Sequence, residues 1–246
     1  MKNILSILLL LLGLNSFAQN ADEIIQKAED RMKGETSYSE VTVTTVRPKY
    51  TREMTIKTWT MGDDYSVTLV LSPAKDKGTV FLKRKNEMWN YVPSIDRLVK
   101  MPPSMLSQSW MGTDIKNDDL LENSSIKEDY NKKIESSEKI EGLDCYKIVL
   151  TPREEVNSIW GKIEMWVSKE DYMQMKVMYY DEDMELINTF LGKSVKVTGG
   201  LKNPSLNVIV PANKKGNETR MLTTKREFDI ELTESFFTTQ NIKRLK

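Results

Sequence analysis

The sequence predicts a mainly β protein with few helices, built on one large antiparallel sheet that is strongly twisted and curled. The first observation is a series of short runs in which apolar and polar residues alternate and Val, Ile, Thr and aromatic residues are frequent, as in strands with one buried face. The second is that turn-forming Gly, Pro, Asp or Asn residues separate these runs. The runs indicate about eleven strands, and sheets of that size curl rather than stay flat.

Residues 1–18 have the three parts of a secretory signal peptide in order. A lysine supplies the positive charge, residues 4–14 are apolar but too short to span a bilayer, and Ser-Phe-Ala forms a small-residue cleavage site. We therefore expect cleavage before Gln19. The remaining chain, residues 19–246, has no evident linker or internal repeat and is expected to form a single exported domain.

Residues 20–33 are the clearest helix in the sequence. Asn20 is a suitable N-cap, Glu23 follows at the capping-box position, and Gly34 ends the pattern. The apolar residues repeat at helical spacing and are Ile24, Ile25, Ala28 and Met32.

The remaining runs are expected to be strands, apart from one region in the middle of the chain. Three-residue and four-residue turns separate several of them, which favours hairpins. The expected strands are 38–46, 52–60, 67–71, 79–84, 88–92, 97–101, 137–140, 145–150, 162–167, 174–180, 186–197, 206–210 and 219–230.

Residues 102–122 are the only other region with helical character. Two prolines suit a first turn, apolar residues fall on one side, and Gly112 ends the pattern, after which Asn117 is placed to cap a second short helix. One helix at the N-terminus cannot cover a sheet this large. We therefore expect the sheet to curl around these segments and to leave an apolar hollow between them.

Residues 101–112 combine methionines, a leucine and a tryptophan with prolines, serines and a glutamine. A buried segment would need partners for each hydroxyl and amide, and an exposed one would form an apolar surface patch. A movable lid over a cavity satisfies both requirements, and methionine suits a surface that accepts varied apolar shapes. The candidate ligand-binding residues of the cavity and lid are Trp59, Leu69, Phe81, Trp89, Tyr91, Met101, Met105, Leu106, Trp110 and Met111.

Several functional classes are disfavoured by composition. Histidine is absent, which excludes Ser-His-Asp catalysis and imidazole zinc sites. The only cysteine, Cys145, lies in an apolar strand, and the carboxylates at 63–64, 118–119 and 181–183 fall where turns or a helix start are expected. With 36 basic and 36 acidic residues, no nucleic-acid partner is expected. We expect no catalytic residue, metal or cofactor.

Several motifs, in this order along the chain, resemble the outer-membrane lipoprotein-sorting (LolA-like) family. The motifs are Lys77-Gly78-Thr79, residues 88–93, residues 102–112, Asn117-Asp118-Asp119-Leu120, Glu128-Asp129-Tyr130, Trp160-Gly161-Lys162 and residues 179–183. The resemblance implies a half-barrel of antiparallel strands with helices in its concave face and a cavity for acyl chains. It also implies a periplasmic, non-enzymatic carrier of lipids or lipoproteins toward the outer membrane.

Two further expectations accompany the resemblance. The partners expected are lipid or lipoprotein acyl chains, an inner-membrane lipid transporter and an outer-membrane acceptor, with the protein itself a monomer. Carriers of this kind hold their lid helices with an arginine near the end of an early strand, whereas residues 60–64 contain none. The alternatives are a non-catalytic accessory protein of an envelope lipid transporter and a hydrolase that uses the carboxylates.

Overall fold

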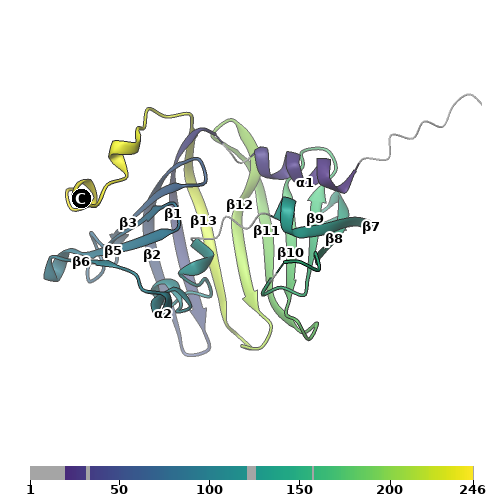
Figure 1. Cartoon of the computed structure of the whole chain (residues 1–246), viewed down its shortest axis with the longest axis horizontal. Coiled ribbons are helices and arrows are strands. Elements are labelled where there is room, and N and C mark those ends of the chain that lie inside the picture. The colour runs from purple at the N-terminus through teal and green to yellow at the C-terminus, as the bar shows by residue number, and fades with distance from the viewer. Residues whose placement is uncertain (1–19, 32–33, 121–125, 157, 246) are drawn as a thin grey trace, which may run out of the picture.

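The computed structural model describes residues 20–31, 34–120, 126–156 and 158–245 (Figure 1). The predicted signal peptide lies outside the described residues. Within them, thirteen strands form one antiparallel sheet, so the predicted fold class is confirmed, and each of the thirteen ranges expected to be strands overlaps one of them. The strands are β1 (Thr36–Arg47), β2 (Tyr50–Met61), β3 (Tyr65–Ser72), β4 (Val80–Arg84), β5 (Glu87–Val92), β6 (Arg97–Lys100), β7 (Tyr130–Ile140), β8 (Leu143–Pro152), β9 (Lys162–Ser168), β10 (Gln174–Tyr180), β11 (Leu186–Thr198), β12 (Leu201–Pro211) and β13 (Glu218–Phe228).

The order of the strands in the sheet is β6-β5-β4-β3-β2-β1-β13-β12-β11-β10-β9-β8-β7. Neighbouring strands are consecutive in the chain except β1 and β13, whose pairing joins two meanders into one sheet. The sheet twists strongly. In Figure 1 the edge strands β6 and β7 run roughly horizontally, whereas the central strands run roughly vertically. Because β6 and β7 are opposite edges, residues 101–129, which connect them, must cross the sheet from edge to edge.

The N-terminal helix α1 (Ala21–Asp30) forms as predicted. The side chain of Asn20 accepts a hydrogen bond from the backbone N–H of Asp22 at 3.1 Å, and Arg31 follows as the C-cap. Ala21, Ile24, Ile25 and Ala28 are buried in a cluster with apolar residues of β8, β9 and β10. The helix therefore covers one face of the β7–β10 half of the sheet; we call this the inner face.

Residues 102–120, the described part of the region with helical character, form only short helical turns. They contain the single turn α2 (Pro103–Leu106) and the 3-10 turns η2 (Trp110–Gly112) and η3 (Asp118–Leu120), and α3 (Ile126–Asp129) follows. Met111 and Gly112 have positive φ angles of 51° and 76°, and this left-handed pair reverses the chain. The backbone then pairs with itself, since Trp110 N–H donates to Ile115 O at 2.7 Å. The side chain of Asn117 donates to the carbonyls of Met105 and Gln108 at 2.9 and 3.1 Å instead of capping a helix.

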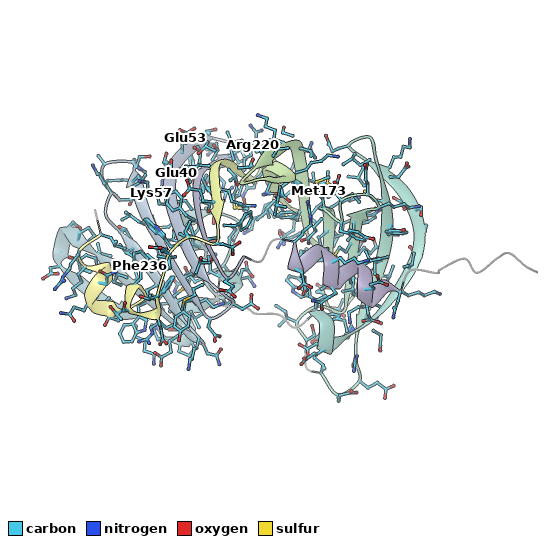
Figure 2. All side chains as sticks on the ribbon, turned by 90° about the horizontal axis from the view of Figure 1, so that it is seen from above. Glu40, Glu53, Lys57, Met173, Arg220 and Phe236 are labelled. Carbon is cyan, nitrogen blue, oxygen red and sulfur yellow. The ribbon has the colours of Figure 1, made fainter. Side chains whose placement is uncertain are left out.

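The opposite, outer face of the β1–β6 half is covered by the C-terminal segment, residues 232–245. This segment contains η4 (Glu234–Phe236) and α4 (Thr239–Ile242). Phe237 and Ile242 are fully buried in a cluster with Val67, Leu69 and other outer-face residues of β3 to β5. Figure 2 labels Phe236 on this segment, beside the strands of that half. This cover was not predicted from the sequence.

Candidate functional site

Residues 101–120 lie over the inner face of β1 to β5, with their apolar side chains toward the sheet. Met101 and Trp110 are buried and Leu106 and Met111 are partly buried, in one cluster with apolar residues of the five strands. Phe81 and Trp110 meet edge to face with ring centroids 5.7 Å apart. The polar residues of the segment, Ser104, Ser107, Gln108 and Ser109, are exposed. This is the amphipathic orientation that a lid requires.

Two arginines at the β1–β2 turn anchor the segment. Arg47 donates to the carbonyl of Gly112 and to the carboxylate of Asp114, each at 2.9 Å. Arg52 donates to the carbonyl of Met111 at 3.0 Å and pairs with Asp76 at 2.6 Å. Anchoring arginines are thus present, at the opposite end of β2 from residues 60–64. Sequence reasoning missed them, although two arginines flanking a tight hairpin turn were a usable signal.

Asp114 also links the segment to the second meander, which consists of β7 to β13. Its side chain is 3% exposed, its carboxylate accepts from the Thr219 hydroxyl at 2.8 Å, and its backbone N–H donates to the same hydroxyl at 2.9 Å. Since Thr219 belongs to β13, Asp114 joins the segment to both halves of the sheet.

Two cavities lie between the inner face and the described residues 110–120 and 126–130. Cavity A, of about 390 Å³, faces the β1–β6 half and is lined by Ile56, Thr58, Thr60, Gly62, Asp63, Tyr65, Ser66, Thr68, Phe81, Lys83, Met88, Trp110, Ile115, Asp119, Leu120 and Met221. Cavity B, of about 270 Å³, faces the other half and is lined by Asp114, Ile115, Asp119, Ile126, Tyr130, Trp160, Ile163, Tyr179, Asn188, Phe190 and Ile209. Ile115 and Asp119 line both, so the two cavities adjoin beneath the segment.

Two charged side chains in these walls have shifted pKa values. Burial raises the pKa of the Asp119 carboxyl, Asp118 adds to the rise, and the hydrogen bond from the Lys116 N–H, 2.7 Å long, opposes it. Burial lowers the pKa of Lys83, while the negative charges of Asp63 and Asp64 act in the opposite direction. The walls of the cavities are therefore largely apolar, and a few of their ionisable side chains are partly removed from water.

The structure brings together some of the ten predicted ligand-binding residues and separates others. Phe81 and Trp110 line cavity A. Met101, Leu106 and Met111 belong to the same apolar cluster, whereas Met105 is 36% exposed. The remaining four lie on the outer face, in the cluster covered by the C-terminal segment, and are Trp59, Leu69, Trp89 and Tyr91. The sequence analysis did not propose the lining of cavity B, although its Trp160, Ile163, Tyr179 and Phe190 lie in or beside strands of alternating pattern.

The cysteine considered in the sequence as a chemical group is buried, and one of the carboxylates is hydrogen-bonded within a turn. The thiol of Cys145 is buried, and this burial raises its pKa. Asp181 accepts the backbone N–H groups of Asp183 and Glu185 in the β10–β11 turn. Among the described residues, no group of three or more His, Cys, Asp or Glu side chains is placed to hold a metal ion. In the same part of the chain, no helix has the length and apolar character needed to cross a membrane.

A protein-family model with the description "uncharacterized protein" matches residues 62–244. The chain belongs to this family. Curated proteins include no match to its sequence. Solved structures do match, and they show that the fold of this chain is LolA-like.

Three of these structures cover nearly the whole chain. A DUF1329 family protein from Desulfovibrio piger has a TM-score of 0.79 at 20% identity and covers 90% of this chain and 97% of its own. A putative outer membrane lipoprotein-sorting protein domain from Vibrio parahaemolyticus has a TM-score of 0.77 at 22% identity, with coverage of 91% and 98%. A LolA superfamily protein from Nitrosomonas europaea has a TM-score of 0.73 at 20% identity, with coverage of 91% and 99%. The resemblance inferred from sequence motifs is confirmed at the level of the fold.

Proposed function

We propose that this protein is a non-enzymatic carrier that holds acyl chains of a lipid or lipoprotein between the inner face and residues 101–120. The observation that carries the proposal is the pair of adjoining cavities beneath an anchored segment with its apolar side inward. The fold, which this chain shares with a putative outer membrane lipoprotein-sorting protein, supports it.

The energetics are sufficient for binding. Each CH₂ group removed from water contributes about 0.8 kcal/mol. A long acyl chain therefore offsets the cost of association and supplies roughly micromolar affinity. A cavity of about 390 Å³ lies within the range of about 300–1,000 Å³ that is common for small-molecule sites.

We further propose that the carrier works in the periplasm, as a monomer of one domain exported by cleavage before Gln19, and moves its cargo toward the outer membrane. An inner-membrane lipid transporter and an outer-membrane acceptor are the partners that such a role requires. Residues 1–18 contain a positive charge, an apolar run and a small-residue cleavage site, in the order found in signal peptides, and this pattern supports export.

Native mass spectrometry of the exported protein, purified without detergent, tests the proposal. We expect a mass that corresponds to cleavage before Gln19 together with a second, heavier species that carries retained lipid. Denaturation should release this lipid for identification.

A pair of tryptophan substitutions gives the experiment its control. Ile209→Trp fills cavity B and should reduce the lipid-bound species, because Ile209 lines that cavity and a long acyl chain would lose the space that adjoins cavity A. Val197→Trp adds the same bulk to a residue that is 71% exposed and should leave the species unchanged. Absence of bound lipid in the parent protein, together with failure to bind added fatty acid, would contradict the proposal and favour the accessory-protein alternative.

A further inference from the structure

Part of the wall of cavity A is polar. Four hydroxyl side chains, from Thr58 and Thr60 on β2 and from Ser66 and Thr68 on β3, line it. Thr58 pairs with Thr68 and Thr60 with Ser66 in the register of the two strands, so the hydroxyls stand in two adjacent rows. The Thr58 and Thr68 hydroxyls are 3.3 Å apart. An alternating strand facing an acyl chain alone would present apolar side chains here.

One row of hydroxyls ends at a lysine. Lys83 on β4 pairs with Ser66 in the sheet, lines cavity A and is only 6% exposed. Lysine is rarely buried to this degree, because removing its ammonium group from water is costly. Asp63 also lines this cavity and, with Asp64 in the same turn, contributes negative charge near the ammonium. Lys83 therefore places an amino group in the wall of the cavity, near the carboxylates of Asp63 and Asp64.

The rest of the lining of cavity A is largely apolar. Ile56 projects from β2 and Phe81 from β4, and Met88 on β5 is the direct partner of Lys83 in the sheet. Trp110 and Leu120 face these side chains from the covering segment. The cavity thus has apolar side chains suited to a hydrocarbon chain, and beside them hydroxyl donors and one amino group, with the carboxylates of Asp63 and Asp119 in the same lining. This division matches the two parts of an amphiphile with an acidic head.

We propose that cavity A selects amphiphiles with an oxyanion head group, a carboxylate or a phosphate, which binds Lys83 and the surrounding hydroxyls while the acyl chain lies against the apolar side chains of the lining. This inference rests on the proposed acyl-chain binding and specifies its ligand class. The bound oxyanion shares the lysine with Asp63, and the Thr and Ser hydroxyls donate to its remaining oxygens.

Matched lipid pairs test the inference. Binding of oleate is compared with that of oleyl alcohol, and binding of oleoyl lysophosphatidic acid with that of mono-oleoylglycerol, by displacement of a fluorescent fatty acid from the full exported chain. We expect the acidic member of at least one pair to bind about tenfold more tightly or better, the size typical of a charge-assisted hydrogen bond. Inorganic phosphate alone should not displace the probe at the same concentrations.

Substitutions locate the selectivity. Lys83→Met should reduce the preference to about twofold or less while leaving the affinity for the uncharged member unchanged, because the hydrocarbon contacts remain. The control Lys57→Met makes the same change on β2, where the neighbours Ile56 and Thr58 face cavity A and Lys57 therefore faces outward. It should retain full selectivity. Thr68→Val, which keeps the side-chain shape, should weaken only the acidic lipids, by a few-fold, and serves if Lys83→Met does not fold.

The outcomes separate this inference from the proposed function. Equal affinity for acidic and uncharged members in the parent protein would overturn the inference and leave acyl-chain binding intact. Unchanged selectivity in Lys83→Met or in Thr68→Val would also overturn it. Tight binding of inorganic phosphate alone would overturn the inference, because the site would then bind a free anion rather than a lipid head group. Failure of all four lipids to bind would overturn both.

Discussion

At the scale of single residues, the ion pair between Arg47 and Asp114 connects the covering segment to the sheet. The two side chains are 12% and 3% exposed, and Thr219 supplies a further hydrogen bond to the carboxylate. Such a pair is costly to desolvate, but removing one partner is worse because it leaves the other charge buried without compensation.

Arg47→Met should therefore lower the free energy of unfolding by about 3 kcal/mol, as expected when a buried pair is broken. Urea denaturation measures this. The double variant Arg47→Met/Asp114→Asn should lose less than Arg47→Met alone, because no uncompensated carboxylate remains. As a control, Arg84→Met breaks the ion pair between Arg84 and Glu234, whose side chains are 40% and 57% exposed. Because this pair is exposed, its loss should lower the free energy of unfolding much less than Arg47→Met does. Equal losses in the Arg47 and Arg84 variants would show that the buried pair does not anchor the segment.

The face of the sheet on which a single residue lies could be predicted only in part from the sequence. The alternation of β2 to β5 places Trp59 and Trp89 on one face and Phe81 on the other, but alternation alone does not say which face borders the cavity. The answer depends on which face the C-terminal segment covers, and Trp59 contacts Phe236 there with ring centroids 5.6 Å apart. The Arg47–Asp114 contact joins residues far apart in the chain, and no local pattern encodes it.

At the scale of elements, α1 and the strands follow from local patterns, whereas the covering segment does not. Caps and apolar spacing predicted α1, since Asn20 and Ile24 act locally. The same spacing suggested a helix over 102–122, but the left-handed Met111 and Gly112 and the backbone pairing of Trp110 with Ile115 turn the chain back instead. Leu106 and Trp110 face inward, as their spacing predicted, whereas Met105 is exposed. A reversed loop therefore buries the inward side chains as well as a helix would.

The short helix α2 offers a test of the segment as a lid. Leu106 is partly buried against the inner-face cluster, while its neighbour Met105 is 36% exposed. Leu106→Asp should weaken fatty-acid binding about tenfold or more by placing a charge on the apolar side of the segment, and should leave the sheet folded. Met105→Asp makes the same change on the outer side and should bind nearly as the parent does.

Circular dichroism and fluorescent fatty-acid titration of both variants give the result. Loss of the β-sheet spectrum in Leu106→Asp would assign the segment to the permanent core. Binding equal to that of the parent would assign it to the surface, and in either case the lid proposal would fail.

At the scale of the whole molecule, the topology explains why a cavity exists at all. The two meanders meet at β1 and β13, so β6 and β7 become opposite edges, and the chain between them has to cross the inner face. A crossing segment with few regular helices cannot fill a curved sheet of thirteen strands, and cavities A and B remain on its two sides. The sequence predicted the large curled sheet and a hollow, whereas the pairing of β1 with β13 and the division of the hollow arise from long-range contacts.

The most direct test of acyl-chain binding on the inner face is photocrosslinking with a fatty acid that carries a diazirine in its chain, followed by peptide mapping. The account predicts labels on residues that line the two cavities, such as Ile115, Trp110 and Phe190, and competition by unlabelled oleate. Labels confined to the outer-face cluster, around Trp89 and Tyr91 beneath the C-terminal segment, would contradict it.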